Sequence, residues 1–198
     1  MRWTLVLLTG LLASCVHAPP SPLDAELGPI NRSEYTSLIA TNTSKVNRYS
    51  GFYQTFQADM TILTTAVQTA ELKQKAHFLL WDIKAYRTER EKMLQEASAY
   101  SKFFMRFYSP EDDYDDFSKG QSIWNIYLEL DGRRIEGKVK KLKSKYVELQ
   151  TLYPHFDRFS TPYEITFNVP MTTLETRACK VILTSSLGSA EFQFPQSK

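Results

Sequence analysis

Seven short stretches with strand-like patterning follow residue 101, and they restrict the possible folds more than any other feature of the sequence. They are rich in aromatic and β-branched residues, and turn residues such as Asp131-Gly132 and Leu187-Gly188 separate some of them. Short strands at this spacing are typical of an antiparallel β-sandwich or a strongly curved sheet. The predicted strands comprise residues 102–109, 122–130, 134–142, 146–149, 163–169, 179–185 and 190–194.

The part of the chain before these strands contains a short helical pattern and one further strand. Ser33, followed by a glutamate, is a suitable helix start, and near-helical spacing of apolar residues predicts a short N-terminal helix over 33–47. Period-two alternation over 52–65 then predicts a strand whose apolar face begins with Phe52. A helix continuous with the next segment is the alternative, but the many threonines favour the strand.

A stripe of apolar residues with helical spacing runs from Leu72 to Tyr100. No glycine or proline interrupts it, and charged residues occupy the other faces. We predict one long amphipathic helix that packs against the sheet. A coiled coil is the alternative, but the stripe lacks good apolar residues at all the positions that a coiled coil needs. Because helices precede most of the strands, the predicted fold class is α+β rather than alternating α/β.

The N-terminus carries a targeting signal. Arg2 precedes an apolar run over residues 3–13, which is shorter than the roughly 20 residues that a helix needs to span a bilayer. A basic start, a short apolar stretch and small residues at its end describe a secretory signal peptide.

The residues that end this run, Leu12, Ala13, Ser14 and Cys15, resemble the lipobox of bacterial lipoproteins. The resemblance covers residues 1–15 and implies that a dedicated peptidase cuts before Cys15, after the thiol has received a diacylglycerol. Such lipoproteins carry more than one acyl chain, which is enough for stable membrane anchoring. Val16 stands where an aspartate would favour the inner membrane, so the same resemblance favours the outer membrane. An ordinary signal peptide with a chance cysteine, or a buried N-terminal helix, is the alternative.

These signals divide the chain into a signal peptide over 1–14, a lipidated tether over 15–32 and a single α+β domain over 33–198. Four prolines in residues 16–31 favour an extended tether, which reaches roughly 50 Å when it is fully stretched. We therefore expect a soluble domain that a lipid anchor holds at a membrane of the cell envelope.

Charge and motif content argue against several function classes. Lys and Arg total 24 and Asp and Glu total 22, whereas a dedicated nucleic-acid binder is usually more basic. Two cysteines cannot form a four-cysteine zinc site. The sequence has no GxSxG, GxGxxG or HExxH motif and no phosphate-binding GxxxxGKS or GxxxxGKT loop. We therefore expect no catalytic residues, no metal, no cofactor and no nucleic-acid partner.

Two charged clusters are candidate binding surfaces. Five carboxylates over 111–116 could bind calcium, but their spacing does not match an EF-hand, so a solvated loop is predicted. Seven cations over 133–145 predict an exposed strand edge, where lysines block unwanted pairing. The alternative is a patch for anionic lipid headgroups, lipopolysaccharide or another polyanion. The residues of this possible anionic-partner patch are Arg133, Arg134, Lys138, Lys140 and Lys141.

Cys179 and two histidines are the remaining candidates for chemistry. Cys179 lies in a predicted strand beside Lys180, and a cationic neighbourhood can lower the pKa of a thiol. An inward-facing strand cysteine, however, usually packs as a small hydrophobic residue. His77 and His155 are isolated from each other in the sequence, so they do not indicate a metal site.

Three functions are consistent with these features. The leading hypothesis is a non-enzymatic envelope lipoprotein whose domain binds another envelope component, either a protein or a surface glycan. It requires an exposed apolar patch. The second hypothesis is a carrier or chaperone for a lipid or lipoprotein, which requires an apolar cavity. The third is a hydrolase of envelope polymers, which requires a cleft that contains the acidic-loop carboxylates or that brings Cys179 and His155 together.

Overall fold

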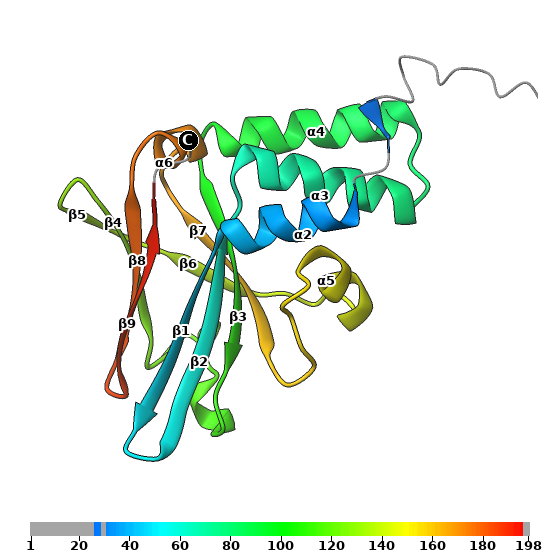
Figure 1. Cartoon of the computed structure of the whole chain (residues 1–198). Helices are drawn as coiled ribbons and strands as arrows, with labels where there is room; N and C mark the ends of the chain where they lie inside the picture. Colours follow the sequence, from blue (N-terminus) through cyan, green and yellow to red (C-terminus); the bar gives the residue numbers. More distant parts are fainter. Residues whose placement is uncertain (1–25, 29–30, 196–198) are drawn as a thin grey trace, which may run out of the picture.

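The computed structural model describes residues 26–28 and 31–195, which fold into two packed antiparallel sheets with a group of helices beside one of them (Figure 1). One sheet has five strands and the other has four. The elements in chain order are α2 (Arg32–Thr41), β1 (Thr43–Ser50), β2 (Tyr53–Ile62), α3 (Thr65–Phe78), α4 (Ile83–Ala97), β3 (Ser101–Tyr108), η1 (Asp112–Tyr114), β4 (Asn125–Leu130), β5 (Arg133–Glu136), β6 (Lys138–Lys141), α5 (Tyr146–Leu152), β7 (Thr161–Phe167), α6 (Met171–Glu175), β8 (Cys179–Ser185) and β9 (Gly188–Phe194).

The strand orders are β1-β2-β3-β7-β6 and β5-β4-β8-β9. The chain passes from the second sheet to the first at Gly137, which separates the edge strands β5 and β6. A Cβ atom at Gly137 would lie 2.8 Å from the ring of Phe167, so the crossing requires a residue without a side chain. At the opposite edges, β1 and β9 lie close together.

The main core fills the space between the sheets. Alternate residues of the strands point inward, as period-two patterning requires, and aromatic rings dominate the contacts. The ring of Phe103 lies 5.5 Å from that of Phe167 and 5.3 Å from that of Phe194, which joins strands of both sheets. The fully buried members include Phe56, Ala58, Met60, Phe103, Met105, Phe107, Leu128, Tyr163, Ile165, Phe167, Val181, Leu183, Ala190 and Phe192.

The helices bury the outer face of the five-stranded sheet. A second apolar cluster joins α2, α3 and α5 to this face, and at its centre the rings of Phe104 and Tyr153 stack with centroids 3.5 Å apart. A third cluster, which includes Ala76, Tyr86 and Met93, packs α4 against α3. The end of α4 returns to the sheets, since Glu96 pairs with Lys102 of β3 and Ala97 joins the core between the sheets.

The α+β class and the two packed antiparallel sheets confirm the predicted fold. Strand β8 has the predicted bounds, and the other confirmed strands differ from prediction by up to three residues at either end. The turn at Asp131-Gly132 connects β4 to β5, as predicted. The turn between β8 and β9 lies one residue earlier than predicted, at Ser186-Leu187, because Gly188 already pairs with Ser185.

The prediction of a single long helix was wrong, because the apolar stripe from Leu72 to Tyr100 is divided between α3 and α4. The α3 helix ends in a Schellman motif, in which the Trp81 amide donates to the Ala76 carbonyl at 2.9 Å and the Leu80 amide donates to the His77 carbonyl. Asp82 then caps α4, since its carboxylate accepts a hydrogen bond from the Ala85 amide at 2.7 Å.

Three further predictions were wrong in detail. The helix predicted over 33–47 ends at Thr41, and the following residues form the edge strand β1, which the prediction lacked. The strand predicted over 134–142 is divided at Gly137 between two sheets. The strand predicted over 146–149 lies in α5, because Leu149 and Leu152 pack on the second cluster at helical spacing.

Candidate functional site

The lipobox residues Leu12, Ala13, Ser14 and Cys15 lie outside the described residues, so lipidation stays a prediction. Within residues 26–28 and 31–195, no helix is long and apolar enough to cross a membrane.

The described chain begins beside the turn between α3 and α4. The carboxylate of Glu26 accepts a hydrogen bond from the Arg87 side chain at 2.9 Å. Leu27 packs with Trp81 and Ile83 on the apolar cluster that joins the two helices. The last part of the predicted tether is therefore fixed to the domain at this end of the helical layer (Figure 1).

The basic segment includes β5 and β6. Each of these strands forms an edge of its sheet, so the predicted edge position is confirmed. Arg134 lies 3.3 Å from Glu129, and the other six cations form no ion pair within the described ranges. Val139 and Ile135 turn toward the core between them, which leaves a continuous exposed cationic edge. Its members are Arg133, Arg134, Lys138, Lys140, Lys141, Lys143 and Lys145.

The acidic loop is only partly solvated, which corrects the predicted solvated loop. Asp115 accepts a hydrogen bond from the Tyr163 hydroxyl at 2.6 Å, and Asp116 accepts one from the Ser122 hydroxyl at 2.9 Å. Burial and the contact with Asp115 raise the pKa of Tyr163. Asp115 therefore fastens the loop to β7, and Asp116 joins it to the segment before β4, whereas the other three are exposed: Glu111, Asp112 and Asp113. In the described part of the chain, no group of three or more His, Cys, Asp or Glu side chains is arranged to hold a metal.

Cys179 and His155 lie on opposite sides of the five-stranded sheet. Cys179 belongs to the core between the sheets, where burial raises the pKa of its thiol to about 11. His155 packs near Phe104 on the outer face, where burial lowers the pKa of its imidazole to about 4. Because a sheet separates them, they cannot form a nucleophile–base pair.

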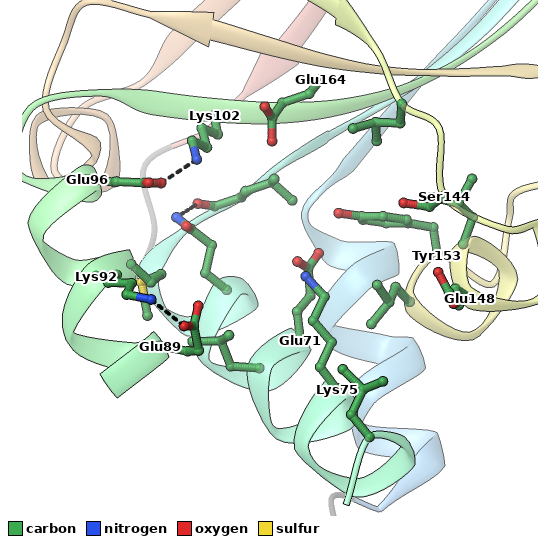
Figure 2. A pocket seen from close by; sticks show the side chains of 18 of the residues that line it. Glu71, Lys75, Glu89, Lys92, Glu96, Lys102, Ser144, Glu148, Tyr153 and Glu164 are labelled. Carbon is green, nitrogen blue, oxygen red and sulfur yellow. Dashed lines mark hydrogen bonds and ion pairs between the residues drawn. The ribbon is translucent and has the colours of Figure 1, made fainter. Parts of the chain in front are cut away.

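A cleft of about 380 Å³ lies between α3, α4 and α5, with residues of β3 and β7 in its wall. Figure 2 shows the side chains that line it. Glu71 is buried in this wall, and burial raises the pKa of its carboxyl group. Its Oε1 atom has no hydrogen-bond partner among the described residues and is shielded from solvent. At the rim, Lys92 pairs with Glu89 at 2.6 Å and Lys102 pairs with Glu96. The cleft also offers a ligand charges of both signs, because four of its charged residues form no ion pair among the described residues: Glu71, Lys75, Glu148 and Glu164.

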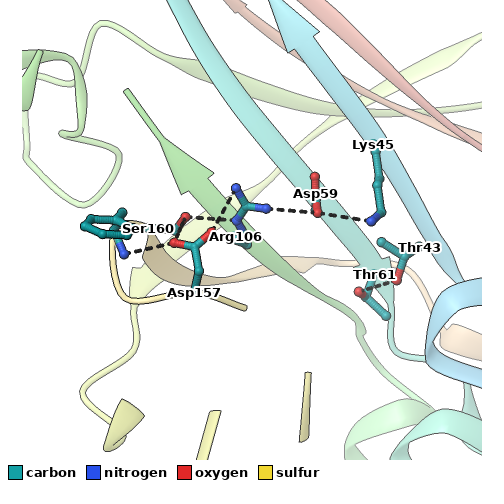
Figure 3. A network of polar contacts seen from close by, with 8 residues as sticks. Thr43, Lys45, Asp59, Thr61, Arg106, Asp157 and Ser160 are labelled. Atoms are coloured by element: carbon teal, nitrogen blue, oxygen red, sulfur yellow. Dashed lines mark hydrogen bonds and ion pairs between the residues drawn. The ribbon is translucent and has the colours of Figure 1, made fainter. Parts of the chain in front are cut away.

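A buried polar network lies on the outer face of the five-stranded sheet (Figure 3). Arg106 lies 3.2 Å from both Asp59 and Asp157, and its Nε donates to the Ser160 hydroxyl at 2.9 Å. Lys45 reaches Asp59 from β1 at 3.6 Å. The network joins β1, β2 and β3 to the loop before β7. Its charged groups pair with one another within the fold.

An aromatic surface that was not predicted from the sequence lies at the tip of the β1–β2 hairpin. Tyr49, Phe52 and Tyr53 are 61%, 104% and 83% exposed. Gly51 and Phe52 form a two-residue turn, and the positive φ of 62° at Gly51 is typical of hairpin turns that begin with glycine. The pairing of β2 with β3 ends at Gln57, so this tip projects beyond the sheet.

Phe52 was assigned to the apolar face of its strand, and this assignment was wrong. Phe52 lies in the hairpin turn rather than in β2, which begins at Tyr53, so it is not part of the alternation that buries Phe56. A glycine between aromatic residues, with strand patterning on both sides, was the signal available in the sequence. We name Tyr49, Phe52 and Tyr53 the aromatic tip.

Comparison with protein-family models, with curated proteins and with solved structures found no match to this chain.

Proposed function

We propose that this protein is a bacterial envelope lipoprotein, a non-enzymatic binding module that a lipid on Cys15 holds at a membrane. The lipobox-like residues that end at Cys15, after a basic start and a short apolar run, carry this proposal. The residue after the cysteine, Val16, favours the outer membrane by the same resemblance. The domain would act on the periplasmic or outer side of that membrane by binding rather than by catalysis.

The aromatic tip supports a binding role, because folding gives no reason for three ring systems at the end of a projecting hairpin. Tyrosine and phenylalanine are enriched at protein interfaces and contribute much of their binding energy. The cationic edge on β5 and β6 supports a partner with anionic groups, either an acidic protein surface or a phosphorylated glycan. We propose that an envelope protein or glycan occupies one or both surfaces.

The carrier and hydrolase alternatives have less support. Packed aromatic side chains fill the space between the sheets, where a carrier of this architecture would hold its apolar ligand. A hydrolase would need catalytic groups that share a cleft, and Cys179 and His155 are separated by a sheet.

The anchor is tested by the variant Cys15→Ala. We expect it to remove the protein from the membrane fraction of cells, or to leave an uncut precursor, because no thiol is available to receive the lipid. Cys179→Ala is the matched control, and it should leave the membrane fraction unchanged because this thiol is buried in the domain core. Mass spectrometry of the intact protein should give a lipidated chain that begins at Cys15. A native protein that begins at Met1, or that remains soluble without detergent, would contradict the anchor.

The binding surfaces are tested by cross-linking in intact cells followed by capture of the protein. We expect a triple variant with serine at Tyr49, Phe52 and Tyr53 to lower the yield of cross-linked partner by about tenfold, since central aromatic residues often contribute more than 1 kcal/mol each.

Two charge variants complete this experiment. Glutamine at Lys138 and Lys140 tests the cationic edge, and glutamine at Arg90 and Lys119 removes two exposed cations from elsewhere on the domain. Loss of partner in the Lys138 and Lys140 variant alone would assign binding to the edge and to anionic groups. Equal yields for the wild type and for both surface variants would contradict the binding role of these surfaces.

A further inference from the structure

A second exposed apolar surface lies at the opposite end of the molecule from the aromatic tip, at the turn between α3 and α4 (Figure 1). Phe78, Leu79 and Leu80 are 42%, 51% and 89% exposed. Trp81 follows them and is partly buried against the cluster that joins the two helices. We name residues 78–81 the apolar turn.

Leu80 in the apolar turn has a backbone conformation that is unusual for leucine. Leu80 has a φ of 52°, in the left-handed region, and it occupies the position after the helix cap where glycine is the usual residue. A leucine in this conformation is strained, and its side chain is almost fully exposed, so it contributes little to the core. An exposed, strained leucine at a position that suits glycine is therefore better explained by a contact outside the domain than by folding.

The segment that contains the apolar turn is basic. Residues 72–88 contain four Lys or Arg residues and one acidic residue, Asp82, whose carboxylate already caps α4. Arg87 pairs with Glu26, which leaves Lys73, Lys75 and Lys84 without an ion pair among the described residues. An apolar loop that carries a tryptophan and has basic residues before and after it has the composition of surfaces that enter the interfacial layer of a bilayer.

The tether reaches the domain at the same place. Leu27 packs on the same apolar cluster as Trp81, and Glu26 pairs with Arg87 one turn into α4. Residues 16–25 separate this point from Cys15, and they span roughly 35 Å when fully extended. A lipid on Cys15 would therefore keep the apolar turn within reach of the membrane surface.

We propose that the apolar turn inserts into the interfacial layer of the bilayer that holds the lipid of Cys15. Phe78, Leu79 and Leu80 would enter the acyl boundary, Trp81 would lie at headgroup level, and the basic residues before and after the turn would face lipid phosphates. The inference rests on the proposed anchor for the position of the domain. It adds an orientation, because the helical end of the domain would then lie on the membrane and the aromatic tip would point away from it.

The fluorescence of Trp81 can report the proposed membrane contact in the mature protein. Cleavage before Cys15 removes Trp3 and leaves two tryptophans, of which Trp124 is buried in the core between the sheets and Trp81 lies in the apolar turn. The experiment reconstitutes the lipidated protein in phosphatidylcholine–phosphatidylglycerol vesicles, with and without bromine on the acyl chains. Bromine quenches tryptophan emission only at short range, so we expect partial quenching from Trp81.

Two variants test which side chains enter the bilayer. Serine at Phe78, Leu79 and Leu80 should abolish the quenching while the protein stays attached through its lipid. Leu80→Gly should weaken the quenching and also raise the thermal stability of the domain, because glycine suits the left-handed backbone. A merely structural role for Leu80 would not give opposite effects on these two measurements.

The triple serine variant of the aromatic tip is the control, and it should be quenched like the wild type. Attached protein without quenching would overturn the insertion of the apolar turn and leave the anchor standing. Protein that does not attach to vesicles would instead overturn the anchor. A Trp81 that is shielded from bromine but changes its emission with protein concentration would mean that a second copy covers the turn, and this outcome would also overturn the inference.

Discussion

Replacing Arg106 with methionine is expected to lower the free energy of unfolding by about 3–5 kcal/mol. The substitution keeps much of the side-chain volume but leaves Asp59 buried without its main counter-charge, since Lys45 is mostly exposed and 3.6 Å away. It also removes the donor that holds Ser160 and Asp157 in the loop before β7. Urea unfolding at neutral pH, followed by circular dichroism, measures the loss.

Two further variants show whether the effect comes from the buried charge. Arg134→Met breaks an exposed pair with Glu129 and should cost less than about 1 kcal/mol. The double variant Arg106→Met with Asp59→Leu should recover most of the lost stability, because it removes the unpaired carboxylate as well. A single Arg106 variant within about 1 kcal/mol of the wild type would mean that water, rather than Arg106, solvates Asp59.

The strands could be predicted because their residues alternate between the core and the outside. In β8, for example, Cys179, Val181 and Leu183 face the core between the sheets, and the predicted bounds agree with the structure. The edge strand β1 was missed because it buries no side chain fully, and without a buried face a strand has no apolar alternation to detect.

The break between α3 and α4 could not be predicted from the usual stop signals. The position after the α3 cap carries Leu80 rather than glycine, so the apolar stripe continues across the turn without interruption. Asp82, three residues before the amide that it caps, was the only local signal of a new helix start. Leu80 therefore made the end of α3 unpredictable from the sequence, and the proposed membrane contact depends on the same residue.

Of the candidate binding surfaces, only the cationic edge, which is defined by its charged residues, could be predicted from the sequence. The cationic edge was predicted as an exposed strand edge, because lysines at alternate positions indicate a strand that no neighbour covers. The aromatic tip and the apolar turn were missed for one shared reason. In a single sequence, Phe52 and Leu80 continue an apolar pattern. In the structure Phe52 lies in the hairpin turn and Leu80 in the left-handed turn after α3, and both side chains are exposed.

Phe107→Ala is expected to lower the free energy of unfolding by about 3–5 kcal/mol, as large-to-small changes at buried phenylalanines usually do. Phe107 is fully buried, and its ring centroid lies 4.6 Å from that of Phe117, 5.4 Å from that of Trp124 and 5.7 Å from that of Phe56. Phe117 belongs to the loop that carries the acidic residues, so the cavity would also loosen this loop. Chemical unfolding measures the stability, and the emission of Trp124 should shift to longer wavelength as water reaches its ring.

The matched control is Phe159→Ala, which removes the same side chain from a position that is 78% exposed. It should change the stability by no more than about 0.5 kcal/mol, because no core contact is lost. Phe107→Leu should lie between the two, since leucine refills part of the cavity. If all three variants were equally stable, the aromatic cluster around Trp124 would not be packed as described. The acidic loop would then depend on hydrogen bonds such as that of Asp115 with the Tyr163 hydroxyl and that of the Trp124 ring with the Tyr114 carbonyl.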